Sequence, residues 1–178
     1  MSVKALKVQL QAEHSKENTN LIVQEIQAKN LSLNDVFNVI KQNEPLFSQR
    51  AAWIISTLSD QNKDLLKPYY HELISLVDTK YHDAVLRATF RTLSGMKIQE
   101  KDQGFVFDTS INLLTSKHTA IAVKAWIIDV LMQIAIPYPE LQNEILLSIK
   151  PQLLYASSGL KGKILKTIQK ISDNFERA

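Results

Sequence analysis

The amino-acid sequence predicts an all-α fold in which pairs of helices stack into a solenoid. Three observations support this prediction: similar segments recur about every 37 residues, apolar residues recur within them at helical spacing, and the 178 residues include only 4 glycines and 5 prolines. Stacked-repeat proteins show a fixed period of roughly 20–50 residues because each unit buries its apolar face against its neighbours. The scarcity of glycine and proline favours long helices joined by short turns over a β fold.

The repeat is clearest in three columns of equivalent positions. A basic residue recurs at intervals of 37 residues, a small residue follows it directly, and a large apolar residue comes two places later. The basic column is Arg50, Arg87, Lys124 and Lys161, the small column is Ala51, Ala88, Ala125 and Gly162, and the large column is Trp53, Phe90, Ile127 and Ile164. We expect the small residues to let helices approach each other and the large residues to fill the space between layers.

Each unit is predicted to consist of two helices, all within a single domain over residues 1–178. The predicted ranges are 32–43 and 44–60, 66–78 and 83–95, 104–116 and 119–136, and 140–156 and 160–175, after one further pair in the first 30 residues. Apolar residues fall on one helical face in these ranges, and no stretch alternates as a strand does. The chain is therefore expected to hold four to five helix pairs.

Polar residues, proline and glycine mark the expected ends of several helices. Ser32 or Asn34 is expected to cap the start of the helix at 32–43, Asp83 the start of the helix at 83–95, and Gly95 the end of the latter. Pro151 lies inside the range 140–156, where the ring of proline and its missing N–H predict a kink or a break.

Composition and charge exclude several classes of protein. The formal net charge is +3, from 21 Lys and Arg against 18 Asp and Glu, which permits contact with phosphates without demanding it. The absence of cysteine excludes disulfides, thiolate metal sites and cysteine nucleophiles, and fits a reducing compartment. The N-terminus has no secretory-signal pattern, and the apolar runs are too short to span a membrane. We therefore expect a cytoplasmic protein that does not contact membranes.

No motif of a known catalytic or cofactor site is present. The sequence contains no phosphate-binding loop, no dinucleotide-binding glycine pattern and no nucleophile elbow, and its 4 histidines do not show the spacing of metal ligands. These observations favour a protein without enzymatic activity, cofactor or metal.

One segment of the repeat indicates a family. The segment LVDTKYHDAVLRATFRTLSGM (76–96) resembles the HEAT-repeat module, in which a first helix ends near an aspartate and a Val–Arg step opens a second helix. QRAAWIISTLSD and AVKAWIIDVLMQI resemble the same second helix, so the resemblance covers roughly 31–175. The family's aspartate has a counterpart only at Asp78, since Asn43 and Ser116 stand at the corresponding places of other units. The resemblance implies a right-handed α–α superhelix of four to five HEAT-like helix pairs with one concave face, and it implies no activity.

The basic column is the first candidate for a binding surface. Arg50, Arg87, Lys124 and Lys161 begin successive second helices, so a solenoid would arrange them in a row. Such a row could follow a phosphate backbone or an acidic peptide. Alternatively, these side chains bind carbonyl or acidic groups at the junctions between repeats. Lys163 adds a further cation on the last helix, where Lys166 and Lys170 share its face, either as a phosphate site or as the polar cap of a terminal repeat.

Trp126 and Asp129 form a second candidate site. They stand three residues apart and are therefore adjacent on one helix surface. In residue type they resemble the Trp and Asp residues that HEAT-like bacterial DNA glycosylases for alkylated purines use on their concave face, although their spacing differs. The alternative is that Trp126 belongs to the apolar core.

The predicted function is a non-catalytic binding or scaffold module that presents a concave helical surface to a protein or peptide. The alternative is a nucleic-acid-binding protein of the HEAT type with glycosylase-like activity. Protein binding predicts an exposed apolar patch, for which Tyr69, Tyr70 and Tyr155 are candidates. Nucleic-acid binding predicts instead that Lys124, Lys161 and Lys163 are exposed on one positive face and that affinity falls steeply with salt.

Overall fold

A computed structural model describes residues 2–176 of the chain, and the side chains of residues 2–173. Within this range the chain consists of helices and connections without a β-strand, so the all-α prediction is confirmed. Two compact units are present, Met1–Thr92 and Leu93–Ala178. The expectation of one domain over residues 1–178 stays a prediction.

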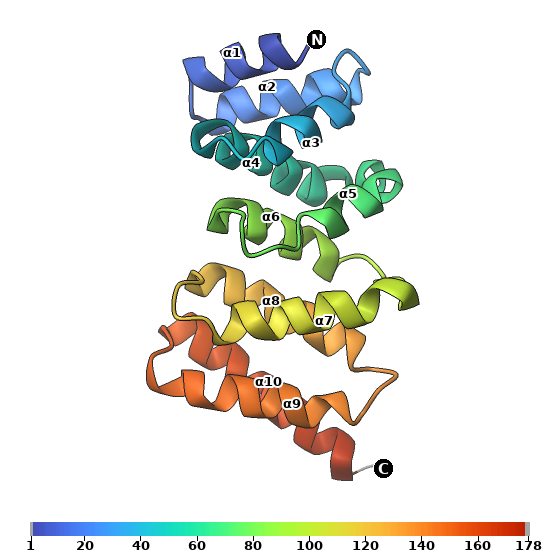
Figure 1. The fold of residues 1–178 in the computed structure, drawn as a ribbon, viewed down its shortest axis with the longest axis vertical. Helices are drawn as coiled ribbons and strands as arrows, with labels where there is room; N and C mark the ends of the chain where they lie inside the picture. Colours follow the sequence, from blue (N-terminus) through green and yellow to red (C-terminus); the bar gives the residue numbers. More distant parts are fainter. Residues whose placement is uncertain (1, 177–178) are drawn as a thin grey trace. The chain divides into compact units, whose positions relative to one another are not determined.

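The first unit is a stack of helices in which equivalent helices pack on one another. Its elements are α1 (Val3–Ala12), α2 (Lys16–Gln27), α3 (Leu33–Lys41), α4 (Pro45–Asn62), the 3₁₀ helix η1 (Lys63–Tyr69), α5 (Tyr70–Ser75) and α6 (Asp83–Ser94). The first helices α1 and α3 contact each other, as do the second helices α2 and α4 (Figure 1). This layered arrangement is that of a solenoid.

The second unit repeats the same arrangement. Its elements are α7 (Glu100–Thr115), α8 (Ile121–Ile134), α9 (Leu141–Ile149), the 3₁₀ helix η2 (Lys150–Leu154) and α10 (Ser158–Glu176). Here the first helices α7 and α9 contact each other, as do the second helices α8 and α10. Within the first pair, α7 packs against α8. The stacking of helix pairs predicted from the sequence is thus confirmed within each unit.

Two prolines determine where predicted helices are interrupted. The break expected at Pro151 is confirmed, because α9 ends at Ile149 and the chain continues as the 3₁₀ helix η2. The single helix expected over 66–78 was wrong: Pro68 lies inside η1, and only the six residues Tyr70–Ser75 are α-helical. A proline lacks the N–H that would continue the α-helical ladder, so the tighter 3₁₀ turn replaces it.

The helix caps follow the sequence in part. Ser32 caps α3 by accepting the Asn34 backbone N–H at 3.2 Å. Asp83 was wrong as a cap, because it is the first residue of α6, and the ring nitrogen Nδ1 of His82 accepts the Ala84 N–H at 3.1 Å. Satisfying such N–H groups is what fixes the start of a helix.

Three of the four residues of the large column fill the core as predicted. Phe90, Ile127 and Ile164 are 0% exposed, whereas Trp53 is half-buried with its ring centroid 5.1 Å from that of His14. The small column is buried at Ala51 and Ala88 and only half-buried at Ala125 and Gly162. The period of the sequence therefore predicts burial more closely for the large column than for the small column.

Polar contacts between neighbouring repeats also recur near the period of the sequence. Four of these contacts join residues 37, 37, 38 and 40 positions apart: Lys7 with Glu44, Asn43 with the carbonyl of Lys80, Gln152 with the carbonyl of Leu114, and Arg50 with the carbonyl of Leu10. The contacts of Arg50 and Gln152 occupy carbonyl groups in the last turns of α1 and α7, where the helical ladder leaves backbone groups without partners.

A left-handed residue after α2 gives a prediction about stability. Lys29 has a φ of 63° and follows the C-cap residue Ala28, a position at which glycine has no steric cost. We expect Lys29→Gly to raise the free energy of unfolding by about 0.5–1 kcal/mol, measured by urea denaturation. Lys29→Ala is the matched control, because it removes the same charge and retains the Cβ. An equal gain in both variants would assign the effect to the lysine side chain and not to the backbone.

Candidate functional site

Arg50, the first member of the basic column, contacts the end of a helix in its own unit. Its guanidinium is half-buried, and Nη1 donates to the carbonyl oxygen of Leu10 and, at 3.3 Å, to that of Gln11. A cation at the C-terminal end of a helix complements carbonyl groups that the helix itself leaves unsatisfied. This geometry matches the alternative in which the column stabilises junctions between repeats.

Arg87 and Lys161 are exposed. Arg87 lies on α6 and Lys161 on α10, and the side chain of neither forms a hydrogen bond or an ion pair with a residue whose side chain the structure describes. Both remain candidates for contacts with an anionic partner. Because they belong to different units, each is a candidate on its own surface.

Lys124 is buried, which contradicts the expectation that it lies on an exposed positive face. Its side chain is 8% exposed, and Nζ donates to Oε1 of Gln152 at 3.0 Å. Gln152 in turn donates from Nε2 to the carbonyl oxygen of Leu114 at 2.5 Å. The break after α9 has placed Gln152 on η2, where its amide joins α7 to α8. The four basic residues therefore occupy different environments.

Trp126, Asp129 and Lys163 come together as one cluster. The ammonium of Lys163 lies 2.5 Å from Oδ2 of Asp129 and 5.5 Å from the centroid of the Trp126 ring. The i, i+3 spacing places Trp126 and Asp129 on the same face of α8, and the packing of α10 on α8 brings Lys163 to them. Ion pairing and a cation–π contact thus use the charge of Lys163 within the protein.

The cluster borders a hollow between α8 and α10. The hollow measures about 530 Å³ and is lined by Asp129, Met132, Ser158, Gly159, Gly162, Lys163, Lys166, Thr167 and Lys170. Lys166 and Lys170 are exposed and form no ion pair with a side chain that the structure describes. Since Asp129 is paired with Lys163, the positive character of this hollow comes from these two lysines.

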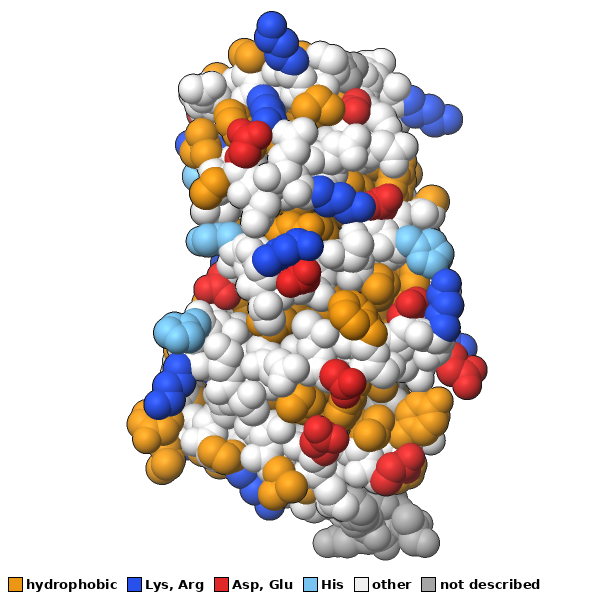
Figure 2. Space-filling model, viewed as in Figure 1, with side chains coloured by type: hydrophobic (Ala, Val, Ile, Leu, Met, Phe, Trp, Pro, Cys, Tyr) orange, Lys and Arg blue, Asp and Glu red, His pale blue; other side chains and the backbone are white. Residues whose placement is uncertain are grey.

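A second hollow lies where the connections between α7 and α8 and between α9 and α10 meet. It measures about 630 Å³ and is lined by Thr115, Lys117, Thr119, Ile121, Lys124, Leu147, Ser148, Pro151, Gln152, Tyr155, Ala156 and Leu160. Several apolar side chains at its rim face solvent: Tyr155 is 86% exposed, Leu147 76% and Ile121 45%, and Leu154 next to Tyr155 is 80% exposed. Figure 2 shows hydrophobic side chains at the lower left edge of the view, where Figure 1 places these connections.

Lys124 lies in this second hollow as a buried cation. Burial lowers the pKa of its ammonium below the ordinary value of 10.5, because the charged form is poorly solvated there. Lys117 also lines the hollow, and no acidic side chain is found among its lining residues in the described part of the chain. The hollow thus combines apolar walls with positive charge.

Of the tyrosines considered for an apolar patch, only Tyr155 is strongly exposed. Tyr70 is 7% exposed, and Tyr69 is half-buried with its ring centroid 5.5 Å from that of Phe37. Sequence reasoning missed Gln152, Leu147 and Ile121. The signal for Leu147 was its position in the run EILLSI, where apolar residues surround the helix and one face must remain outside the core.

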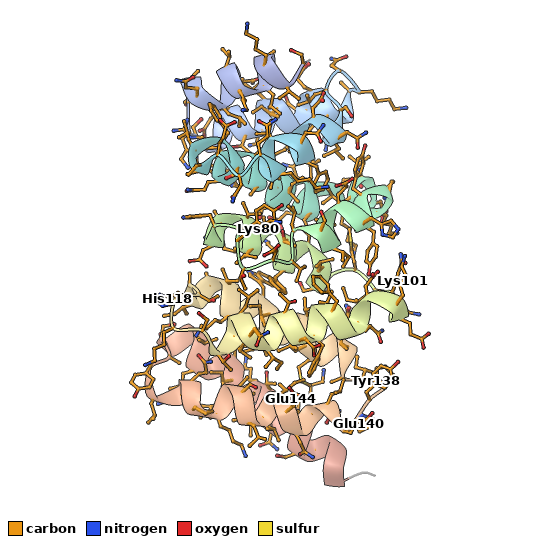
Figure 3. The ribbon with its side chains drawn as sticks, viewed as in Figure 1. Lys80, Lys101, His118, Tyr138, Glu140 and Glu144 are labelled. Atoms are coloured by element: carbon orange, nitrogen blue, oxygen red, sulfur yellow. The ribbon has the colours of Figure 1, made fainter. Side chains whose placement is uncertain are left out.

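Over residues 2–173, no group of three His, Cys, Asp or Glu side chains is placed to hold a metal ion. Figure 3 shows His118 and Tyr138 at opposite ends of the α7–α8 pair, while Glu140 and Glu144 lie near the start of α9.

None of the described helices is long and apolar enough to cross a membrane.

The packing of first helices on first helices and of second helices on second helices defines a helical-repeat protein. The HEAT repeat domain family matches residues 6–171, and the chain belongs to this family. This match confirms the resemblance drawn from the segment 76–96. No curated protein and no solved structure matches the chain.

Proposed function

We propose that the protein is a non-catalytic binding module whose second unit holds a protein or peptide partner on the apolar rim of the second hollow, the one that Leu147 and Tyr155 line. The observation that supports this proposal is the exposure of Leu147 on α9 and Tyr155 after η2, which line the same hollow, together with that of Leu154, the chain neighbour of Tyr155. A contiguous apolar patch of this kind is typical of interaction surfaces, whereas singly exposed apolar residues are common on any protein.

The chemistry of the rim suits a peptide. Burying one exposed leucine or aromatic side chain contributes roughly 1.5–3 kcal/mol. Tyrosine contributes both contact area and a hydroxyl group, which is why it is frequent among the residues that dominate binding energy. A partner that covers Tyr155 and the two leucines would thus gain enough free energy to offset part of the cost of its own immobilisation.

Nucleic-acid binding is the second candidate, and one observation favours it. Lys166 and Lys170 are exposed at the hollow between α8 and α10, and Lys161 lies on the same helix. Lys163 is already paired with Asp129. Binding of a DNA duplex or single strand that weakens sharply between about 50 and 200 mM salt would support this alternative.

The proposal is tested by selecting binders from a library of short random peptides with the full chain and measuring their affinity by fluorescence polarisation. We expect the double variant Leu154→Ser, Tyr155→Ser to weaken binding at least about tenfold. The matched control is Val8→Ser, Leu21→Ser, which removes two apolar side chains that are 63% and 55% exposed in the first unit. Equal affinity for both double variants, or no selected peptide at all, would contradict the proposed site.

A further inference from the structure

The second hollow contains the ammonium of Lys124, whose environment is unusual for a lysine because it is buried. The Lys124 side chain is 8% exposed, and its ammonium has three N–H donors, of which the Oε1 of Gln152 accepts one. No carboxylate among the described residues forms an ion pair with it. A buried charge without a counterion is costly to the protein, and an external anion that bound in the hollow would offset this cost.

The rest of the lining defines which anion fits. Lys117 adds a second positive charge, and the hydroxyl groups of Thr119 and Ser148 provide further hydrogen-bonding groups. Leu147, Tyr155 and Ile121 supply apolar surface around them. A ligand that combines negative charge with an apolar group therefore suits the hollow, within a volume of about 630 Å³. That volume falls in the range of roughly 300–1,000 Å³ that is typical of ligand sites.

We propose that this hollow binds the C-terminal carboxylate of a partner polypeptide whose last residue is apolar, with Lys124 as the cation that receives the carboxylate. The inference rests on the proposed function, since it specifies which part of a peptide the apolar rim holds. In a C-terminal residue the carboxylate and the side chain branch from one Cα atom. The carboxylate can thus reach the ammonium while the side chain contacts Leu147 and Tyr155.

An acidic side chain within a partner fits the hollow less well. An internal aspartate or glutamate would bring a peptide group on each of its two sides against the apolar walls, and each N–H or carbonyl without a partner there has an unfavourable desolvation free energy. A C-terminal residue brings only one such group. The Gln152 amide remains bound to Leu114 in this arrangement and keeps the Lys124 side chain in place.

The test compares two mixtures of fluorescently labelled synthetic pentapeptides that end in leucine, one with a free carboxylate and one with a C-terminal amide. Binding to the full chain is measured by fluorescence polarisation. We expect the free-carboxylate peptides to bind at least about tenfold more tightly, because the amide has no charge to offer Lys124. Lys124→Met, which keeps the apolar stem and removes the ammonium, should abolish this difference.

The control variant is Lys161→Met, which removes the same charge from an exposed position in the second unit and should retain the preference for the free carboxylate. Equal binding of the two peptide mixtures by the wild-type chain, with the affinity still dependent on Leu154 and Tyr155, would overturn the inference and leave the proposed function standing. Absence of binding by both mixtures and by all library peptides would overturn both. If N-acetyl-leucine alone displaced the peptides at the same concentration as the peptides themselves, the site would be one for small acids and the inference would fail.

Discussion

Replacing Phe90 with alanine is expected to lower the free energy of unfolding by about 3–5 kcal/mol, the cost of truncating a fully buried aromatic side chain. Phe90 is 0% exposed in the middle of α6 and belongs to the large apolar column of the repeat. Truncation removes the apolar surface of the ring from the core and leaves a cavity that the surrounding helices fill only in part. Urea denaturation followed by circular dichroism measures the effect.

The matched control for this substitution is Phe105→Ala. Phe105 is 53% exposed on α7, so its truncation removes an equal number of atoms from a position that is already hydrated. We expect a change within about 1 kcal/mol there. Comparable losses in the two variants would mean that the large column does not form the core of the stack, against the burial of Phe90, Ile127 and Ile164.

Much of the fold could be predicted because the repeat constrains the core. A residue of the large column fills the space between layers at Phe90, Ile127 and Ile164, and the period alone predicts this burial, whereas Trp53 at the same place of the repeat is only half-buried. The break at Pro151 was predictable for a local reason, since proline cannot donate the hydrogen bond that an α-helix requires. Pro68 had the same chemistry, but the range around it was predicted as one helix because its apolar spacing continued past the proline.

The surface was less predictable, since a position on a helix does not define what packs above it. Arg50 contacts carbonyl groups at the end of α1, whereas Lys161 faces solvent, although both lie in the first two turns of the second helix of a pair. Lys124 is covered because η2 brings Gln152 to it, and this depends on the geometry of the chain after the break.

The pairing of Asp129 with Lys163 had a signal in the sequence. The two residues lie 34 positions apart, close to one period, and equivalent second helices pack on each other in a solenoid. A search for opposite charges separated by about one repeat would have predicted this ion pair. The same search predicts the pair formed by Lys7 and Glu44, which are 37 positions apart.

Lys124→Met is expected to raise the free energy of unfolding at neutral pH by about 1–2 kcal/mol, because it replaces a buried, unpaired charge with an apolar side chain of similar length. Burial lowers the pKa of Lys124 below 10.5, its ordinary value. Below the lowered pKa both states are protonated, and the cost of burying the charge is complete. Between the lowered pKa and 10.5 the unfolded chain binds more protons at this site than the folded chain, so the stability of the wild type rises with pH through that window.

The stabilising effect of Lys124→Met should therefore be largest near neutral pH and shrink as the pH rises toward about 10. Urea denaturation of both proteins over this range measures the difference, in which the contributions of Lys117 and Tyr155, the other titratable groups that line the hollow, cancel. Lys161→Met, at an exposed site, should show neither the gain nor its dependence on pH. A loss of stability in Lys124→Met at every pH would mean that the bond to Gln152 outweighs the cost of burying the ammonium. If the predicted gain is found together with a loss of peptide binding, the protein retains Lys124 for its ligand at the expense of its own stability.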